Sequence, residues 1–157
     1  MRLAILAALA ALAACSPQPS AEATPAATAP AVHPVSGLKI IPVTATTAKG
    51  KHTFRAEVAA SAAEQQRGLM FRTEMGPDEA MIFPRNPPGP ASFWMSNTPL
   101  PLDIIYIGPD RKVINIAGGV PYSLEALPAA GPTAAVLELN AGRAAELGIV
   151  PGTRIDW

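Results

Sequence analysis

The residues best suited to chemistry lie between Ser92 and Asp103, in the run Ser-Phe-Trp-Met-Ser-Asn-Thr-Pro-Leu-Pro-Leu-Asp. The run holds one of the two tryptophans, and after this tryptophan the same run contains short polar residues and an aspartate. An aromatic face beside a few short polar groups is typical of the wall of a small-ligand cleft. Such residues beside prolines also stabilise turns, so a structural role for Asn97, Thr98 and Asp103 is the alternative.

Trp94 and Met95 are neighbours, and neighbouring side chains of an extended strand point to opposite faces. In one arrangement, one of them is buried while the other lines a surface groove. In the other arrangement, both lie in the core of a strand that is buried on two sides, as large apolar side chains usually are.

Two arginines, Arg67 and Arg72, bracket the run Gly-Leu-Met-Phe. A guanidinium group can bind a carboxylate or phosphate through two parallel hydrogen bonds, so either arginine could anchor an anionic ligand. Structural ion pairs with Glu57, Glu64 or Asp103 are the alternative.

Tyr122 completes the candidate set, because its ring can pack toward the same region while its hydroxyl stays in water. A tryptophan face also packs well against the C–H surfaces of sugars, and polar neighbours can bind sugar hydroxyls. We therefore predict a binding or scaffold module with a site for a glycan, a cell-wall fragment or another small molecule, formed by Trp94, Asn97, Asp103, Arg67 and Tyr122.

The sequence contains no Gly-x-Ser-x-Gly motif and no His-Glu-x-x-His motif. A catalytic base would have to be Asp103 or Glu57. The competing hypothesis is therefore a hydrolase of an envelope substrate, with Asp103 as the base and Arg67 as the anion anchor.

Met70, Met75, Met81 and Met95 lie within 26 positions of one another, and thioether sulfur is a soft ligand suited to Cu(I). A methionine copper site that includes His52 is a third hypothesis. Methionine is also an ordinary core residue, and the sequence has no tight Met-x-x-Met repeat, so we expect no metal and no cofactor.

The N-terminus has the features of a secretory signal. After Met1-Arg2 comes an apolar run from Leu3 to Ala14, shorter than the roughly 20 residues of a membrane-spanning helix. The run Leu-Ala-Ala-Cys that ends at Cys15, the sole cysteine, resembles a bacterial lipobox. We predict a signal peptide over residues 1–14 and a lipid anchor on Cys15, with an ordinary signal peptide and an incidental cysteine as the alternative.

The lipobox resemblance implies that diacylglycerol alkylates the thiol and that the new N-terminus is acylated. Each buried methylene of an acyl chain adds about 0.8 kcal/mol to membrane binding, and a single chain anchors a protein only marginally. Three acyl chains, such as palmitate, would therefore hold the protein at the membrane. Ser16 follows the cysteine where Asp usually marks inner-membrane retention. The resemblance therefore implies the bacterial outer membrane, with the protein facing the periplasm.

Residues 15–37 are rich in proline and alanine, so we predict a disordered spacer after the lipidated cysteine, in which His33 is solvated. Residues 38–157 are enough for a single domain with its own core. The 12 acidic and 12 basic residues balance, and no basic run exceeds two, so nucleic acid is not an expected partner.

The pattern along residues 38–157 predicts a mainly β domain, sandwich-like or barrel-like, with two short helices. Expected strands cover 38–44, 52–58, 79–83, 91–96, 103–107, 112–117, 133–139 and 153–157, with a proline-rich loop at 84–90. The expected helices are 62–69, with a capping box of Ser61 and Glu64, and 141–147, with Asn140 as its cap.

Glu138 lies inside one of these strands, between Leu137 and Leu139. Strand alternation turns its side chain away from the face of the two leucines. We therefore expect Glu138 to be solvated.

Three segments together resemble the domain of unknown function family 192 (DUF192), a group of small extracytoplasmic or membrane-associated proteins of bacteria and archaea. They are Gln-Arg-Gly-Leu-Met-Phe-Arg at 66–72, Ser-Phe-Trp-Met-Ser-Asn-Thr at 92–98 with Pro-Leu-Asp at 101–103, and Val-Leu-Glu-Leu-Asn-Ala-Gly at 136–142. Ser96 stands where lysine is common in that family. The resemblance covers about 54–156 and implies a small, mainly β domain with no established activity.

Overall fold

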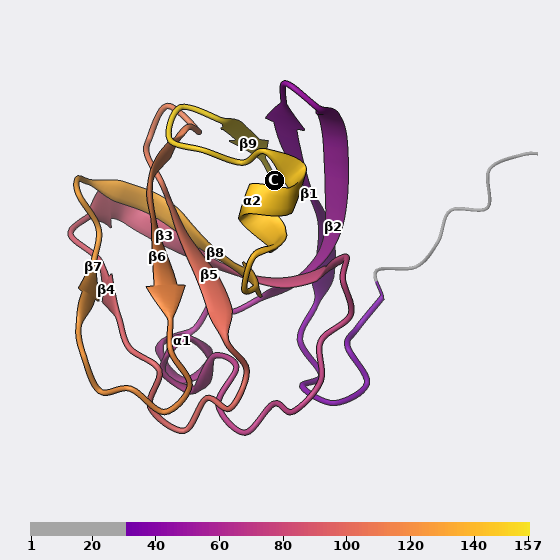
Figure 1. The fold of residues 1–157 in the computed structure, drawn as a ribbon. Coiled ribbons are helices and arrows are strands. Elements are labelled where there is room, and N and C mark those ends of the chain that lie inside the picture. Colours follow the sequence, from indigo (N-terminus) through magenta and orange to yellow (C-terminus); the bar gives the residue numbers. More distant parts are fainter. Residues whose placement is uncertain (1–30) are drawn as a thin grey trace, which may run out of the picture.

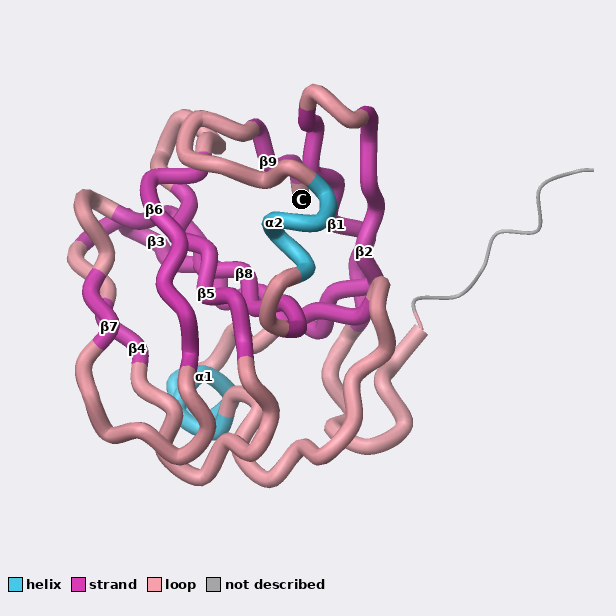
Figure 2. Tube along the Cα trace, in the orientation of Figure 1, coloured by secondary structure: helices cyan, strands magenta, loops and turns pink. Residues whose placement is uncertain are grey.

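The computed structural model describes residues 31–157, and Figures 1 and 2 show how their strands and helices are arranged. Within these residues the helices are α1 (Ala62–Arg67) and α2 (Arg143–Leu147). The strands are β1 (Ile40–Thr47), β2 (Gly50–Val58), β3 (Glu79–Gly89), β4 (Ser92–Phe93), β5 (Leu102–Ile107), β6 (Val113–Gly119), β7 (Leu127–Pro128), β8 (Thr133–Asn140) and β9 (Arg154–Asp156).

Seven strands form one sheet in the order β6-β5-β8-β3-β2-β1-β9, and β4 pairs with β7 in a separate ribbon. Of the neighbouring strands in the sheet, only β2 and β3 are parallel, because the chain between them crosses over through α1. The two edges of the sheet meet where Lys112 and Arg154 form an isolated bridge, but the sheet does not close into a barrel. The predicted mainly β fold with two short helices is confirmed.

Two hydrophobic clusters lie on opposite faces of the central strands β3, β5 and β8. The first joins the sheet to α2 and includes Ile82 and Leu137. The second includes Met81 and Val136, the direct neighbours of those residues, together with Leu69 from the loop after α1. Because successive residues of a strand point to opposite faces, the central strands are buried on both sides.

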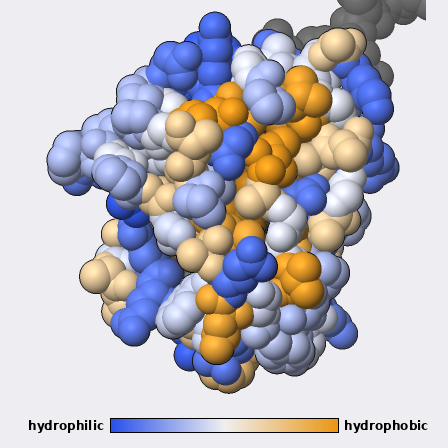
Figure 3. All heavy atoms as spheres, turned by 60° about the vertical axis from the view of Figure 1, so that its left-hand side comes forward, coloured by the Kyte–Doolittle hydropathy of each residue, from blue (hydrophilic) through white to orange (hydrophobic). Residues whose placement is uncertain are grey.

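One side of the molecule keeps apolar surface exposed to solvent. Figure 3 brings forward the side on which β4 and β7 lie in Figure 1, and hydrophobic residues form a band across it. The exposed residues Trp94, Val120 and Leu124 belong to the segments that flank this ribbon. Exposed apolar surface of this kind commonly marks a binding surface.

Helix α1 begins as the sequence predicts. The Ser61 hydroxyl accepts a hydrogen bond from the backbone N–H of Glu64, and the Glu64 carboxylate accepts one from the backbone N–H of Ser61. The helix ends at Arg67, two residues earlier than expected, because Gly68 leaves the helical conformation with φ of +46°.

Strand β3 is longer than the sequence predicts, and the expected loop at 84–90 is largely part of it. The ladder to β8 pairs Pro84 with Ala135 and resumes only at Gly89 with Thr133. Pro87 and Pro88 lie in the irregular segment between these pairs, so their missing N–H groups remove no bond from that ladder.

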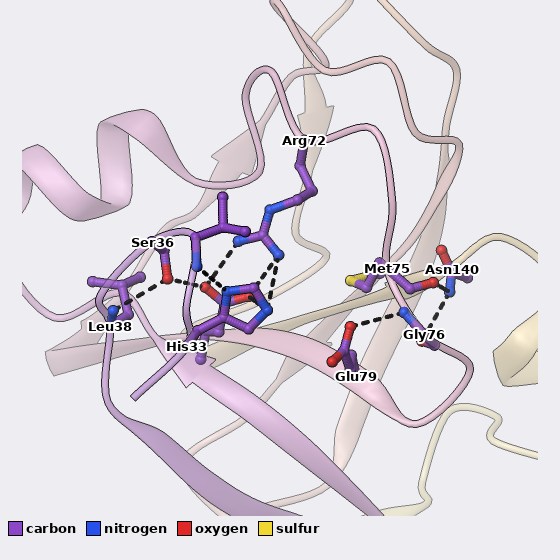
Figure 4. A network of polar contacts seen from close by, with 10 residues as sticks. His33, Ser36, Leu38, Arg72, Met75, Gly76, Glu79 and Asn140 are labelled. Atoms are coloured by element: carbon purple, nitrogen blue, oxygen red, sulfur yellow. Dashed lines mark hydrogen bonds and ion pairs between the residues drawn. The ribbon is translucent and has the colours of Figure 1, made fainter. Parts of the chain in front are cut away.

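The prediction that Asn140 caps the second helix is wrong. The N-cap residue of α2 is Gly142, which has no side chain to accept a hydrogen bond from the first turn of the helix. The Asn140 amide instead donates to the carbonyl oxygens of Met75 (2.9 Å) and Gly76 (3.1 Å), which fixes the loop before β3 (Figure 4).

The segment before β1 is attached to the domain by a buried polar network, which we call the N-terminal clasp (Figure 4). Arg72 Nη1 lies 3.0 Å from Glu57 Oε1, and His33 Nε2 lies 3.7 Å from the same oxygen. The Ser36 hydroxyl donates to Glu57 Oε2. His33 is only 8% exposed, so the prediction of a solvated linker residue is wrong.

Residues 1–30, which include the predicted signal peptide, Cys15 and most of the predicted spacer, lie outside the described residues. Between residues 31 and 157, no helix has the length and apolar character needed to cross a membrane.

The clasp provides a test of what holds residues 31–39 in place. Glu57→Gln leaves Arg72 buried without its carboxylate, and removing one partner of a buried ion pair costs about 3 kcal/mol or more. We expect a loss of that size in urea unfolding and faster proteolysis before Ile40. The exposed Glu74→Gln serves as the control, and equal stability of the two variants would show that the clasp does not stabilise the domain.

Candidate functional site

Glu138 lies at the centre of the sheet and is only 4% exposed. It is directly opposite Met81 of β3 and Ile104 of β5, so its side chain shares the face of the second hydrophobic cluster. The expectation of a solvated side chain is wrong. Alternation does turn Glu138 away from Leu137 and Leu139, but the opposite face is a second core and not the solvent.

The Glu138 carboxyl has no polar partner for one of its oxygens. Among the described residues, Oε2 accepts no hydrogen bond, and no Lys, Arg or His forms an ion pair with this carboxyl. Burial raises the pKa of Glu138 from 4.5 to about 8. A buried group left in this state commonly indicates a functional site.

A narrow cavity of about 40 Å³ opens onto this carboxyl, and we call it the Glu138 slot. Its volume suffices for one or two water-sized groups. Its walls come from the end of α1 and the following loop, from β3 and from the segment after β4. They include Arg67, Leu69, Phe83, Phe93, Trp94 and Thr98.

Aromatic packing positions the inner wall of the slot. Phe93 makes edge contacts with Phe83, at a centroid distance of 5.0 Å, and with Tyr106, at 6.1 Å. The Tyr106 hydroxyl donates to the Leu127 carbonyl, which ties the β4–β7 ribbon to β5. Burial raises the pKa of Tyr106 to about 12, and the Glu138 charge acts in the same direction, so this hydroxyl stays protonated at neutral pH.

Met95 anchors the segment that carries Trp94. Met95 is 1% exposed whereas Trp94 is 55% exposed, which confirms the arrangement with one buried residue and one at a groove. A Cβ atom at Gly119 would lie 2.5 Å from Met95 Sδ, so Met95 occupies space that only glycine leaves free. The indole is thereby held at the surface beside the slot.

Trp94 also lines a shallow groove of about 240 Å³, which we call the Trp94 groove. Phe93 and Leu124 form further parts of its wall. Both Trp94 and Leu124 are exposed apolar residues, so the groove offers apolar surface to a ligand. Slot and groove share Phe93 and Trp94, so one ligand could occupy both.

Of the predicted site residues, Trp94 and Arg67 both line the Glu138 slot. The Arg67 guanidinium carbon lies 5.7 Å from the centroid of the Phe71 ring, and the side chain is exposed. Arg72 is occupied by the ion pair with Glu57, which is the structural alternative considered for the arginines.

Asn97 and Tyr122 lie on neighbouring loops but do not line the slot as the structure describes it. Both have positive φ, +53° and +62°, and both act through their backbones. The Asn97 carbonyl accepts a hydrogen bond from the Phe71 N–H, and the Tyr122 N–H donates to the Thr98 carbonyl. They join the loops that surround Trp94.

Asp103 lines neither the slot nor the groove, so the structure separates it from the other predicted site residues. Its carboxylate accepts hydrogen bonds from the backbone N–H groups of Gly142 (3.1 Å) and Ala144 (2.8 Å). It therefore caps helix α2, where a negative charge also interacts favourably with the helix dipole.

The methionines do not gather at a surface site, because Met81 and Met95 are buried in the second hydrophobic cluster. Within residues 31–157, no group of three His, Cys, Asp or Glu side chains is placed to hold a metal ion.

The capping role of Asp103 can be measured directly. Asp103→Asn keeps one acceptor oxygen and loses the other, so we expect a loss of about 1 kcal/mol in the free energy of unfolding. The exposed Glu125→Gln is the control in urea denaturation. An unchanged unfolding midpoint for Asp103→Asn would contradict the capping role.

The buried carboxyl of Glu138 should make stability depend on pH. Because its pKa is raised on folding, the folded state holds the proton more tightly, and stability falls as pH rises from 4.5 to about 8. Glu138→Gln removes this titration. We expect the stability of the variant relative to the natural protein to increase by on the order of 3 kcal/mol between pH 5 and pH 8.

That difference is obtained from urea unfolding curves of the two proteins at several pH values. A difference that stays constant across this range would show that the Glu138 carboxyl is not buried in the folded protein.

The comparisons with known proteins agree with the resemblance noted in the sequence. A crystal structure of a protein of unknown function from Novosphingobium aromaticivorans DSM 12444 is 63% identical, with a TM-score of 0.81; the match covers 83% of this chain and 94% of that one. A protein from Sinorhizobium meliloti 1021 described as a "putative transcription regulator" is 37% identical, with a TM-score of 0.73, over 76% of this chain and 94% of its own. No match was found among the curated proteins. The family model of DUF192, described as "Uncharacterized ACR", matches residues 43–157, and the chain therefore belongs to this family.

Proposed function

We propose that this protein is a lipid-anchored module of the bacterial envelope that binds a glycan or a cell-wall fragment. The ligand lies in the Trp94 groove and places one polar group in the Glu138 slot. The observation that carries the proposal is a buried carboxyl, with one oxygen that has no hydrogen-bond partner, in the lining of a slot beside a half-exposed indole.

The anchor is part of the proposal and is supported by the sequence of residues 1–37. The lipobox-like run at Cys15 and the proline-rich segment after it favour a domain tethered to the outer membrane on its periplasmic side. The N-terminal clasp would then be the point where the tether joins the domain, since it fixes His33 and Ser36 to Glu57.

A bound ligand would explain two features that are unfavourable in the folded protein alone, namely an unpaired buried oxygen and an exposed indole. A buried carboxyl oxygen without a hydrogen bond costs free energy, and a polar ligand group in the slot would supply the missing partner. The exposed indole beside it offers a flat apolar face to the C–H surface of a sugar, and burying that face on binding is favourable.

Binding is favoured over hydrolysis by the positions of the carboxylates. The hydrolase hypothesis needs Asp103 beside Arg67, whereas Asp103 caps α2 and Arg67 lines the slot. Glycoside hydrolysis generally uses two carboxyl groups that flank the bond. Among the described residues that line the slot, Glu138 is the only one with a carboxylate.

Nucleic-acid binding, suggested by the description of the Sinorhizobium relative, has less support. Binding to phosphates requires a surplus of clustered lysine and arginine. This chain has 12 basic and 12 acidic residues, and no basic run exceeds two.

The proposal is tested with Trp94 fluorescence in a Trp157→Phe background, which leaves a single indole. We expect a saturable change with a glycan or a peptidoglycan fragment in a ligand screen. Trp94→Ala should weaken binding at least about tenfold, measured by calorimetry, because the indole is the main contact surface. Val150→Ala, an exposed apolar residue between α2 and β9, is the matched control and should bind normally.

No change in Trp94 fluorescence across the screen, with a Trp94→Ala variant that still folds, would overturn the proposed function.

A further inference from the structure

We infer that the Glu138 slot receives a primary ammonium group, so that the ligand is a cell-wall fragment with a free primary amine, such as a peptidoglycan stem peptide whose diamino acid is not cross-linked. This inference rests on the proposed function and specifies the part of the ligand that enters the slot.

The size of the slot selects a compact group. A cavity of about 40 Å³ holds one or two water-sized groups, and an ammonium group on its terminal carbon meets this limit. A planar guanidinium or a trimethylammonium group has several more heavy atoms than a cavity of this volume holds.

The walls of the slot favour a cation. Three aromatic residues, Phe83, Phe93 and Trp94, line the slot, and a cation that lies over the face of such a ring is attracted to it. The Thr98 hydroxyl donates to the Ser96 carbonyl, so its oxygen remains free to accept an N–H bond. The carboxyl of Glu138 supplies the opposite charge, which an ammonium group pairs with more strongly than a hydroxyl does.

Arg67, from α1, is the sole cationic residue that lines the slot in the described structure. Its guanidinium lies over Phe71 and is exposed to water, where its charge is screened. Tyr106, from β5, faces Glu138 but titrates only near pH 12. Strand β3 and the segment after β4 contribute no ionisable side chain to the lining, so Glu138 alone titrates there between pH 6 and pH 8.

Binding of an ammonium group should therefore release a proton. With a pKa of about 8, Glu138 is mostly protonated at pH 7, and ionising it there lowers the affinity roughly tenfold. The affinity should rise with pH until it levels off above pH 8. A primary alkyl amine keeps its charge over this range, because its pKa is about 10.

The experiment compares three probes by calorimetry at pH 6, 7 and 8, each in two buffers with different ionisation enthalpies. They are a disaccharide–tetrapeptide with a free side-chain amine, the same compound acetylated on that amine, and the disaccharide alone. For the free amine we expect about a tenfold rise in affinity from pH 6 to pH 7, about a fivefold rise from pH 7 to pH 8, and release of nearly one proton at pH 7. Acetylation should weaken binding at least about tenfold.

Glu138→Gln provides the matched variant, because the amide keeps the shape of the side chain and cannot ionise. It should bind the free-amine and acetylated probes equally and show no proton release, while its urea unfolding curve confirms that it is folded. If the natural protein binds the acetylated compound or the disaccharide as tightly as the free amine, without pH dependence, the ammonium inference is overturned and the binding function stands. If it binds none of the three and Trp94 fluorescence does not change, both fail.

Discussion

The constraint on which the rest of the structure depends is that the strands β3, β5 and β8 are buried on both faces. One hydrophobic cluster joins them to α2, and the second fills the space beneath the β4–β7 ribbon and the loop after α1. The buried side chains of these strands must therefore be almost all apolar. Glu138 is the only charged residue among the buried residues of β3, β5 and β8, and it lies in the second cluster where the slot opens.

The same constraint positions the outer part of the site. The second cluster needs a cover, and it is provided by Leu69 from the loop after α1 and by Phe93 and Met95 from β4 and the segment that follows it. Each insertion holds a neighbouring residue at the surface: Met95 fixes Trp94, and Leu69 fixes the segment that follows Arg67. The geometry of slot and groove thus follows from core packing, with backbone hydrogen bonds at Asn97 and Tyr122 joining the loops.

Local patterns in the sequence predicted the elements, and long-range contacts decided the roles of the polar residues. Ser61 and Glu64 form their capping box because both partners lie within one helical turn. Asp103 caps a helix about 40 residues later, which no local pattern could indicate. Strand alternation predicts a solvated Glu138, but alternation alone cannot say whether the other face of a sheet is covered.

Asp103 and Glu138 have the opposite roles to those predicted from the sequence, and they affect the stability of the fold in opposite directions. Asp103 contributes to folding, because both of its oxygens accept backbone hydrogen bonds. Glu138 opposes folding at neutral pH, because its carboxyl is buried and one oxygen has no partner. A leucine at the same place would suit the surrounding cluster of Met81, Ile104 and Val136 better. The fold does not need this carboxyl, and under the proposed function a polar ligand group in the slot would supply the hydrogen-bond partner that Glu138 Oε2 lacks.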